Sequence, residues 1–112
     1  FKGMAVNKSA FTPEDLEAYK DAAAKRGALT ATLNYYRNAI QHFSLFNKNW
    51  GVLNVPTLMI WGEKDTALGR ELSYGTATYV NPFQIRYIPD ASHWVQQEKP
   101  ELVNEYMREF LR

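Results

Sequence analysis

The sequence predicts an α/β fold with a parallel sheet, and three observations favour it. Thr57 to Trp61 is a short apolar run without alternation between Pro56 and Gly62, which is typical of a strand buried on both faces. Gln84 to Ile88 is a second strand-like run, and residues 99–111 have the apolar spacing of a helix that lies on a sheet. Strand, crossover helix, strand and helix make up half of a parallel sheet. We therefore expect a complementary part that carries further strands.

The first part of the chain predicts two helices joined as a helical hairpin. After an irregular lead-in over residues 1–11, Thr12 can cap a helix that starts with Pro13, and Gly27 can end it. A second helix is expected to open near Thr30, because apolar residues follow at intervals of three and four that place them on one face. These residues are Leu33, Tyr36, Ile40 and Phe43.

The second part of the chain alternates strands with helices. Residues 47–54 contain asparagines, a lysine and a glycine, and they predict a linker between the two parts. A crossover helix is expected from about Arg70 to Val80, despite Gly75 in its middle. The final helix opens at Lys99-Pro100, and its apolar residues form one stripe that fits against a sheet. They are Leu102, Val103, Tyr106, Met107, Phe110 and Leu111.

Composition excludes several classes of function. The chain has 112 residues, of which 46% are hydrophobic and 22% charged, as in a globular domain or part of one. The net charge of +1 comes from interspersed signs, so nucleic acid and anionic membrane are not implied as partners. The absence of cysteine excludes disulfides and thiolate chemistry, and no apolar run is long enough for a transmembrane segment. The start at Phe1 lacks a signal-peptide pattern, which favours the interior of a longer chain and a cytoplasmic location.

Polar residues with catalytic potential follow each predicted strand. Asp65 comes after the first strand and His93 after the second, 28 residues later. Since parallel strands end at the same edge of a sheet, the two loops could lie side by side. A carboxylate bound to one ring nitrogen would fix the imidazole tautomer and leave the other nitrogen to take a proton from a hydroxyl or water. The alternative is structural, with Asp65 as a turn former and His93 as a packed residue.

Tyr36 has two interpretations. As a member of the apolar stripe it would simply pack against neighbouring elements. Because polar residues surround it, its hydroxyl could instead point into a cleft and act on a substrate oxygen. His42, in the same helix, has no acid at ligand spacing and is interpreted as structural, and no zinc or calcium spacing predicts a metal site elsewhere.

Three segments together resemble the α/β-hydrolases, in particular the soluble epoxide hydrolases. Val55 to Asp65 reads Val-Pro-Thr-Leu-Met-Ile-Trp-Gly-Glu-Lys-Asp and resembles the acid segment of that family. Ala91 to Pro100 reads Ala-Ser-His-Trp-Val-Gln-Gln-Glu-Lys-Pro and resembles the histidine segment. Leu33 to Asn38, Leu-Asn-Tyr-Tyr-Arg-Asn, resembles the last part of the helical cap. The matches follow the order and spacing of the family over nearly the whole chain.

The resemblance implies a fold and its division. The chain would be the carboxyl-terminal portion of an α/β-hydrolase sheet, with two parallel strands and flanking helices, preceded by the end of a helical cap. Residues 1–46 would then be the cap remnant, 47–54 the linker and 55–112 part of the hydrolase core.

The resemblance also implies a cofactor-free hydrolase that converts an epoxide to a vicinal diol. In that family an aspartate nucleophile opens the epoxide to an ester, and a water activated by a histidine hydrolyses the ester. Carried over by motif, Asp65 is the acid that orients the histidine and His93 is the base. Tyr36 is one of two cap hydroxyls that bind and protonate the epoxide oxygen.

Several parts of the family pattern have no match in this sequence. The oxyanion-hole motif His-Gly-x-Pro, the nucleophile elbow and the second cap tyrosine are expected upstream of Phe1, so we expect the chain to be inactive alone. Its expected partners are a small-molecule epoxide and the complementary amino-terminal half, from the same gene or a second chain, or a self-dimer. Two rivals are a haloalkane dehalogenase, which would have halide-binding groups instead of cap tyrosines, and a non-catalytic fragment that serves as a scaffold or interaction subunit.

Overall fold

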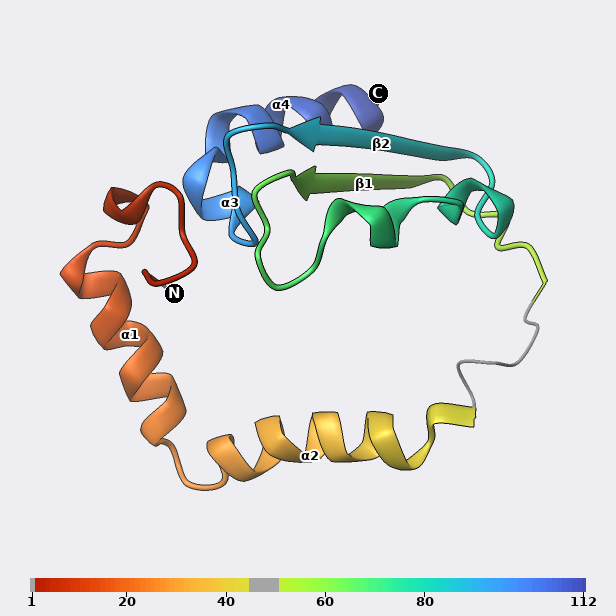
Figure 1. Cartoon of the computed structure of the whole chain (residues 1–112). Coiled ribbons are helices and arrows are strands. Elements are labelled where there is room, and N and C mark those ends of the chain that lie inside the picture. Colours follow the sequence, from red (N-terminus) through yellow and green to blue (C-terminus); the bar gives the residue numbers. More distant parts are fainter. Residues whose placement is uncertain (1, 45–50) are drawn as a thin grey trace. The chain divides into compact units, whose positions relative to one another are not determined.

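A computed structural model describes residues 2–44 and 51–112, and its elements are labelled in Figure 1. The chain divides into two compact units. The core unit contains residues 2–11 and 51–112, and the helical unit contains the described residues from Thr12 onward up to residue 44. The first half of the expected linker, residues 47–50, lies outside the described residues.

The core unit is built on two parallel strands, β1 (Thr57–Gly62) and β2 (Phe83–Ile88). Their register pairs Thr57 with Phe83 and Gly62 with Ile88, so both strands end at the same edge. Figure 1 shows the two arrows pointing the same way, with both following loops at that edge. Both predicted strands and their parallel pairing are confirmed.

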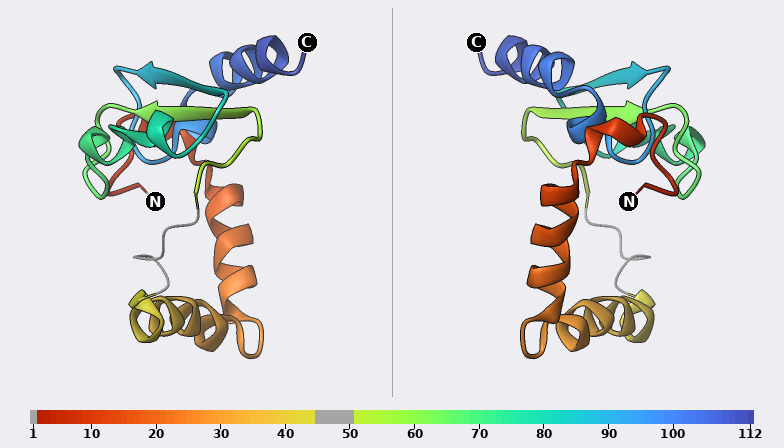
Figure 2. Two further views of the ribbon diagram at one scale, coloured as in Figure 1. Left: turned by 90° about the vertical axis from the view of Figure 1, so that its right-hand side faces the viewer. Right: turned by 90° about the vertical axis from the view of Figure 1, so that its left-hand side faces the viewer.

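The apolar core of this unit lies between the strands and the last helix. Ile88, Ala91 and Val103 are buried, and Val103 belongs to α4 (Pro100–Phe110), whose prediction is confirmed. In both views of Figure 2, α4 lies on one side of the strands and the segment between β1 and β2 on the other. The residues that pack around the buried cluster are Ile60, Val95, Leu102 and Tyr106. The end of the α4 stripe stays open, with Met107 47% and Leu111 76% exposed.

The crossover helix predicted over residues 70–80 is wrong. The structure has two short 3-10 helices there, η3 (Arg70–Ser73) and η4 (Thr76–Thr78). Gly75 lies between them with φ of 76°, a left-handed conformation that ends a right-handed helix. The hydroxyl of Ser73 bonds instead to the Arg70 carbonyl and, at 2.7 Å, to the hydroxyl of Tyr87 on β2. This side-chain bond to β2 and the backbone bonds between Leu53 and residues 79 and 81 therefore help to hold the connection.

The lead-in at the start of the chain belongs to the core unit. It contains the 3-10 helix η1 (Lys8–Ala10), and the side chains on either side of that turn are buried, Ala5 at 5% and Phe11 at 2% exposure. Phe11 meets Trp94 edge to face at 6.0 Å between ring centroids. The segment thus covers the loop that follows β2.

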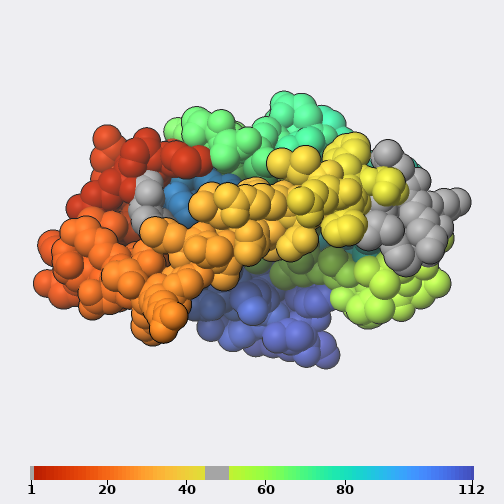
Figure 3. Space-filling view, turned by 90° about the horizontal axis from the view of Figure 1, so that it is seen from below, coloured from red at the N-terminus to blue at the C-terminus, as the bar shows by residue number. Residues whose placement is uncertain are grey.

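The helical unit contains α1 (Pro13–Ala24) and α2 (Ala28–Gln41), as predicted. Thr12 and Asp15 form a capping box at the start of α1, and Gly27, with φ of 83°, makes the turn into α2. No residue of α1 or α2 is buried. Figure 3 shows one face of α2, in orange and yellow, as an open row of side chains. Of the apolar stripe predicted for α2, Leu33, Tyr36 and Ile40 are 54%, 63% and 76% exposed.

Candidate active site

Asp65 is placed by the turn that ends β1. Its backbone N–H donates to the Gly62 carbonyl, and its side-chain Oδ1 accepts the N–H groups of Ala67 and Leu68 at 2.8 and 2.9 Å. The carboxylate therefore shapes its own loop, as the structural interpretation expected. Only Oδ1 is used in this way, which leaves Oδ2 for another partner.

His93 is placed by the loop that runs from β2 into a short helix, α3 (Val95–Glu98). Two backbone bonds tie the strand-end loops together, from the Glu63 N–H to the Ile88 carbonyl and from the Lys64 N–H to the Ala91 carbonyl, both 3.0 Å. The register of the sheet alone would bring the loops near each other. These bonds fix their relative position.

Gly62 allows the two loops to touch. A Cβ atom at this position would lie 2.1 Å from the Ser92 carbonyl oxygen and 2.5 Å from that of Ala91. These are backbone atoms held by other bonds, so no side chain fits there without moving the His93 loop. The glycine in the Trp-Gly-Glu-Lys-Asp sequence is thus required by a close approach.

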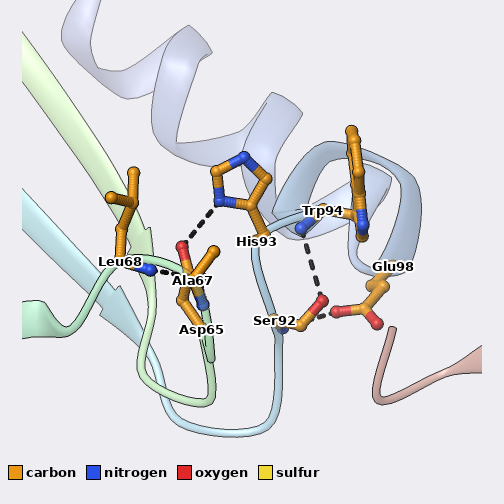
Figure 4. A network of polar contacts seen from close by, with 7 residues as sticks. All are labelled: Asp65, Ala67, Leu68, Ser92, His93, Trp94 and Glu98. Atoms are coloured by element: carbon orange, nitrogen blue, oxygen red, sulfur yellow. Dashed lines mark hydrogen bonds and ion pairs between the residues drawn. The ribbon is translucent and has the colours of Figure 1, made fainter. Parts of the chain in front are cut away.

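The two loops bring Asp65 and His93 into direct contact. His93 Nδ1 lies 2.8 Å from Asp65 Oδ2, and Figure 4 shows the ring with Nε2 directed away from the carboxylate. The Asp65 side chain is 7% exposed and that of His93 is 37% exposed. The sequence prediction that these two side chains meet is confirmed, whereas their catalytic roles stay predictions.

The surroundings of Asp65 favour its charged form. Burial raises the pKa of this carboxyl, but the hydrogen bonds from the Leu68 N–H, from His93 and from the Ala67 N–H outweigh burial, so the pKa lies below its ordinary value. Asp65 is therefore ionised near neutral pH and accepts a proton-bearing nitrogen. That places the proton of neutral His93 on Nδ1 and leaves the Nε2 lone pair able to accept one.

A cavity of about 180 Å³ lies beside this pair. Asp65, Ser92 and His93 line one part of it, and apolar side chains line the rest. The apolar lining comes from Ile60, Trp61, Leu68 and Val95. A cavity with apolar walls and a few polar groups suits a small, mostly apolar ligand or a water next to the imidazole.

Tyr36 is not part of this assembly in the core unit. It lies on α2 in the helical unit, 63% exposed, with its ring edge to face against Tyr35 at 5.4 Å. Its role towards a substrate oxygen stays a prediction. His42 follows α2 as its C-cap residue, and its structural interpretation stays a prediction.

One residue next to the site escaped sequence analysis. Glu98 is 5% exposed, and its carboxylate accepts the backbone N–H of Ser92, directly before His93. The only signal in the sequence was its place in the Ala91 to Pro100 segment, five residues after the histidine. Helix α3 was missed as well, because four residues are too few to show a period.

The described ranges, residues 2–44 and 51–112, contain neither a metal-binding cluster nor a membrane-spanning helix. No group of three histidine, cysteine or acidic side chains there could hold a metal ion. None of the helices in these ranges is long and apolar enough to cross a membrane.

Comparisons with known proteins agree on one family of relatives. The chain is 44% identical to epoxide hydrolase 3 of Xenopus tropicalis over 100 aligned residues. The aligned region covers 88% of this chain and 26% of that protein. The chain is 39% identical to the AB hydrolase superfamily protein YfhM of Bacillus subtilis over 98% of this chain and 38% of the relative. No protein-family model matches.

Solved structures give the same result for the fold. The crystal structure of an epoxide hydrolase from Bacillus megaterium with an inhibitor superimposes with a TM-score of 0.80 at 34% identity. The match covers 95% of this chain and 39% of that structure. The chain thus spans between about a quarter and two fifths of the length of these proteins.

Proposed function

We propose that this chain, a carboxyl-terminal portion of an α/β-hydrolase related to the epoxide hydrolases, supplies the acid and the base of a site that hydrolyses epoxides. The observation that carries the proposal is the 2.8 Å bond between His93 Nδ1 and Asp65 Oδ2 at the common edge of two parallel strands. An orienting carboxylate and an imidazole with a free second nitrogen form the unit that activates water in such a hydrolysis.

The reaction would take place in two steps. A carboxylate nucleophile from the complementary part attacks an epoxide carbon, the carbon–oxygen bond breaks, and the oxygen takes a proton from the Tyr36 hydroxyl. His93 Nε2 then removes a proton from a water as the water oxygen attacks the ester carbonyl. Asp65 stabilises the imidazolium that forms. The tetrahedral intermediate then collapses, the ester bond breaks, the leaving oxygen takes a proton, and the diol departs as the nucleophile carboxylate is restored. The imidazolium proton returns through water to the Tyr36 phenolate, which restores both groups for the next turnover.

The proposed cap role of Tyr36 rests on its motif and its exposure. Its neighbour Tyr35 is 73% exposed on the same helix and offers a matched control. Tyr36→Phe should slow epoxide opening by about a hundredfold, as expected for a lost general acid, whereas Tyr35→Phe should leave the rate nearly unchanged.

We further propose that the complementary amino-terminal part of the hydrolase fold covers the open apolar surface of the core unit. A cavity of about 390 Å³ lies between β1 and α4 and is lined by Leu58, Ile60, Met107, Phe110 and Leu111. Within the described residues, Trp61 Nε1 is buried with no hydrogen-bond acceptor. Further strands and helices from the complementary part would cover this cavity and supply a hydrogen-bond acceptor for Trp61 Nε1.

The test is the turnover of styrene oxide to its diol by the purified full-length protein. His93→Gln should lower kcat at least about a hundredfold, since the base that activates water is lost. His42→Gln is the matched control, because His42 lies at a helix end in the helical unit, and it should keep the parent rate. The intact mass of the active sample shows whether a second polypeptide accompanies this chain.

Three results would contradict the proposal. A His93→Gln variant with the parent rate would remove the imidazole from the mechanism. A parent protein that converts a chloroalkane but not an epoxide would favour the dehalogenase instead, and one that converts neither would favour the scaffold.

A further inference from the structure

Glu98 is a buried acid without a cationic partner in the described part of the chain. It is 5% exposed, and the ion pairs formed by residues 2–44 and 51–112 do not include it. Glutamates are almost never this deeply buried unless their charge is compensated, because desolvation of a carboxylate is costly. Its contacts must therefore supply that compensation.

Two backbone N–H groups supply it, and they come from opposite ends of the chain. Oε2 accepts the Ser92 N–H at 2.6 Å, and Oε1 accepts the Asn7 N–H at 2.9 Å. Each carboxylate oxygen thus has its own charge-assisted bond. Glu98 itself is held in place by its N–H, which donates to the Trp94 carbonyl at 2.9 Å in α3.

The bond to Ser92 fixes the backbone of the loop between β2 and α3, which carries His93. Ser92 is fully buried, directly before His93, and its carbonyl is packed against Gly62 on the side of the Asp65 loop. Figure 4 shows Asp65 and Glu98 on opposite sides of the loop. The loop that carries His93 is thus held between the Asp65 loop on one side and Glu98 on the other.

The bond to Asn7 brings a second layer onto the same loop. Asn7 caps η1, and the buried Phe11 that follows this turn packs edge to face on Trp94. Trp94 in turn lies edge to face against the His93 ring, at 5.2 Å between centroids. The segment around η1 therefore contacts the His93 ring indirectly, through Trp94. The bond between Glu98 and the Asn7 N–H holds this segment against the loop.

We propose that Glu98 is a positioning residue for His93, which holds the loop so that Nδ1 meets Asp65 and Nε2 faces the reacting water. The inference deepens the proposed function and rests on it for the reaction. The geometric part, that Glu98 maintains the contact between His93 and Asp65, is independent of any substrate.

The decisive variant is Glu98→Gln, which keeps the volume of the side chain. The amide has one oxygen for two N–H donors, and its NH2 group would face a backbone donor, so one bond is lost and one N–H is left unsatisfied. Glu105→Gln is the matched control, an exposed glutamate in the middle of α4. Asp65→Asn serves as the reference for a broken contact.

The first readout is the nitrogen-15 NMR signal of the His93 ring. The parent and Glu105→Gln should show Nδ1 protonated in neutral imidazole. In Glu98→Gln the ring signals should shift towards the mixture of tautomers that we expect for Asp65→Asn. The second readout is styrene oxide turnover by the full-length protein, where Glu98→Gln should lower kcat about tenfold with KM unchanged.

The outcomes separate this inference from the proposed function. If Glu98→Gln keeps both the parent tautomer and the parent kcat, the inference is overturned. If the parent shows no turnover but Glu98→Gln loses the tautomer, the positioning role stands and the epoxide hydrolase proposal fails. Should the variant not fold, hydrogen exchange in the parent decides: a Ser92 amide that exchanges as fast as an exposed amide overturns the inference, and a protected one supports it.

Discussion

The core unit and the helical unit differ in how much apolar surface they bury. In the core unit two strands and α4 bury Ile88 and Val103 within the unit itself, and the loops at the strand ends are locked by backbone bonds. In the helical unit neither α1 nor α2 buries a residue, and Ile40 on the α2 stripe is 76% exposed. The core unit thus fixes the Asp65–His93 contact by its own packing, whereas apolar side chains of α2 such as Ile40 stay exposed.

The largest difference should appear when an isoleucine is truncated in each unit. Ile88→Ala in the core should lower the free energy of unfolding by about 2–5 kcal/mol, because it removes buried methylenes and leaves a cavity. Ile40→Ala on α2 should change it by less than about 0.5 kcal/mol. Urea denaturation of both variants measures this, and equal losses would contradict the contrast between the units.

A glycine comparison tests the close approach of the two loops. Gly62→Ala should cost about 1–3 kcal/mol and loosen the His93 loop, because its Cβ would overlap two backbone carbonyls. Gly3→Ala, in the same unit, meets nothing within 4 Å and should be neutral. Thermal unfolding and amide exchange at Ser92 record the effect. A Gly62→Ala variant as stable as Gly3→Ala would show that the loops can separate at no cost.

The capping box of the helical unit should have a smaller and strictly local effect. Thr12→Ala removes the hydroxyl that accepts the Asp15 N–H at 3.1 Å, at a cost of about 1 kcal/mol. Amide exchange should increase in the first turn of α1 and stay unchanged at Ile88. A change that spread to the core strands would mean that the two units unfold together.

Acidification should act weakly on both units, and Asp15 and Asp65 can each be followed as a reporter of one unit. Hydrogen bonds from the Thr12 N–H and hydroxyl lower the pKa of Asp15. Burial raises the pKa of Asp65, but hydrogen bonds in its loop and from His93 outweigh burial and lower that pKa. Because both values are lower in the folded chain, the stabilisation is complete above the ordinary aspartate range and is lost as the pH falls through the folded values. The start of α1 and the His93–Asp65 contact should therefore weaken below about pH 4.

Carbon-13 NMR of the two carboxyl groups follows this titration. Asp15→Asn should abolish the response of α1 and leave that of Asp65 intact. A midpoint for either carboxyl above that of an ordinary aspartate would contradict the assigned hydrogen bonds.

Periodicity and local chemistry predicted much of the fold. The strands β1 and β2, the stripe of α4 and the Thr12 cap were all predicted correctly, because each is encoded within a few consecutive residues. The full burial expected of the first strand is not seen, since Thr57 to Trp61 are only half-buried. The resemblance to α/β-hydrolases is confirmed by relatives and solved structures. The contact between Asp65 and His93 followed from topology, since parallel strands bring their ends to one edge.

Two of the failures involve a partner that lies outside the local stretch of sequence. The helix expected from Arg70 to Val80 does not form, because Gly75 adopts a left-handed conformation and Ser73 bonds to Tyr87 on the neighbouring strand. Glu98 reads as a surface acid until its bond to Asn7, 91 residues away, is known. Such partners are set by tertiary packing, which overrides local propensity.

The central claim is that Asp65 and His93 act as one unit, and a double-mutant cycle tests it most directly. The kcat for diol formation from styrene oxide is measured for Asp65→Asn, His93→Gln and the double variant of the full-length protein. Asp65→Asn alone should slow turnover about 10² to 10⁴-fold, and the double variant should be no slower than His93→Gln, because the acid works only through the base. Effects of the two substitutions that multiply would show that the residues act independently and would contradict the account.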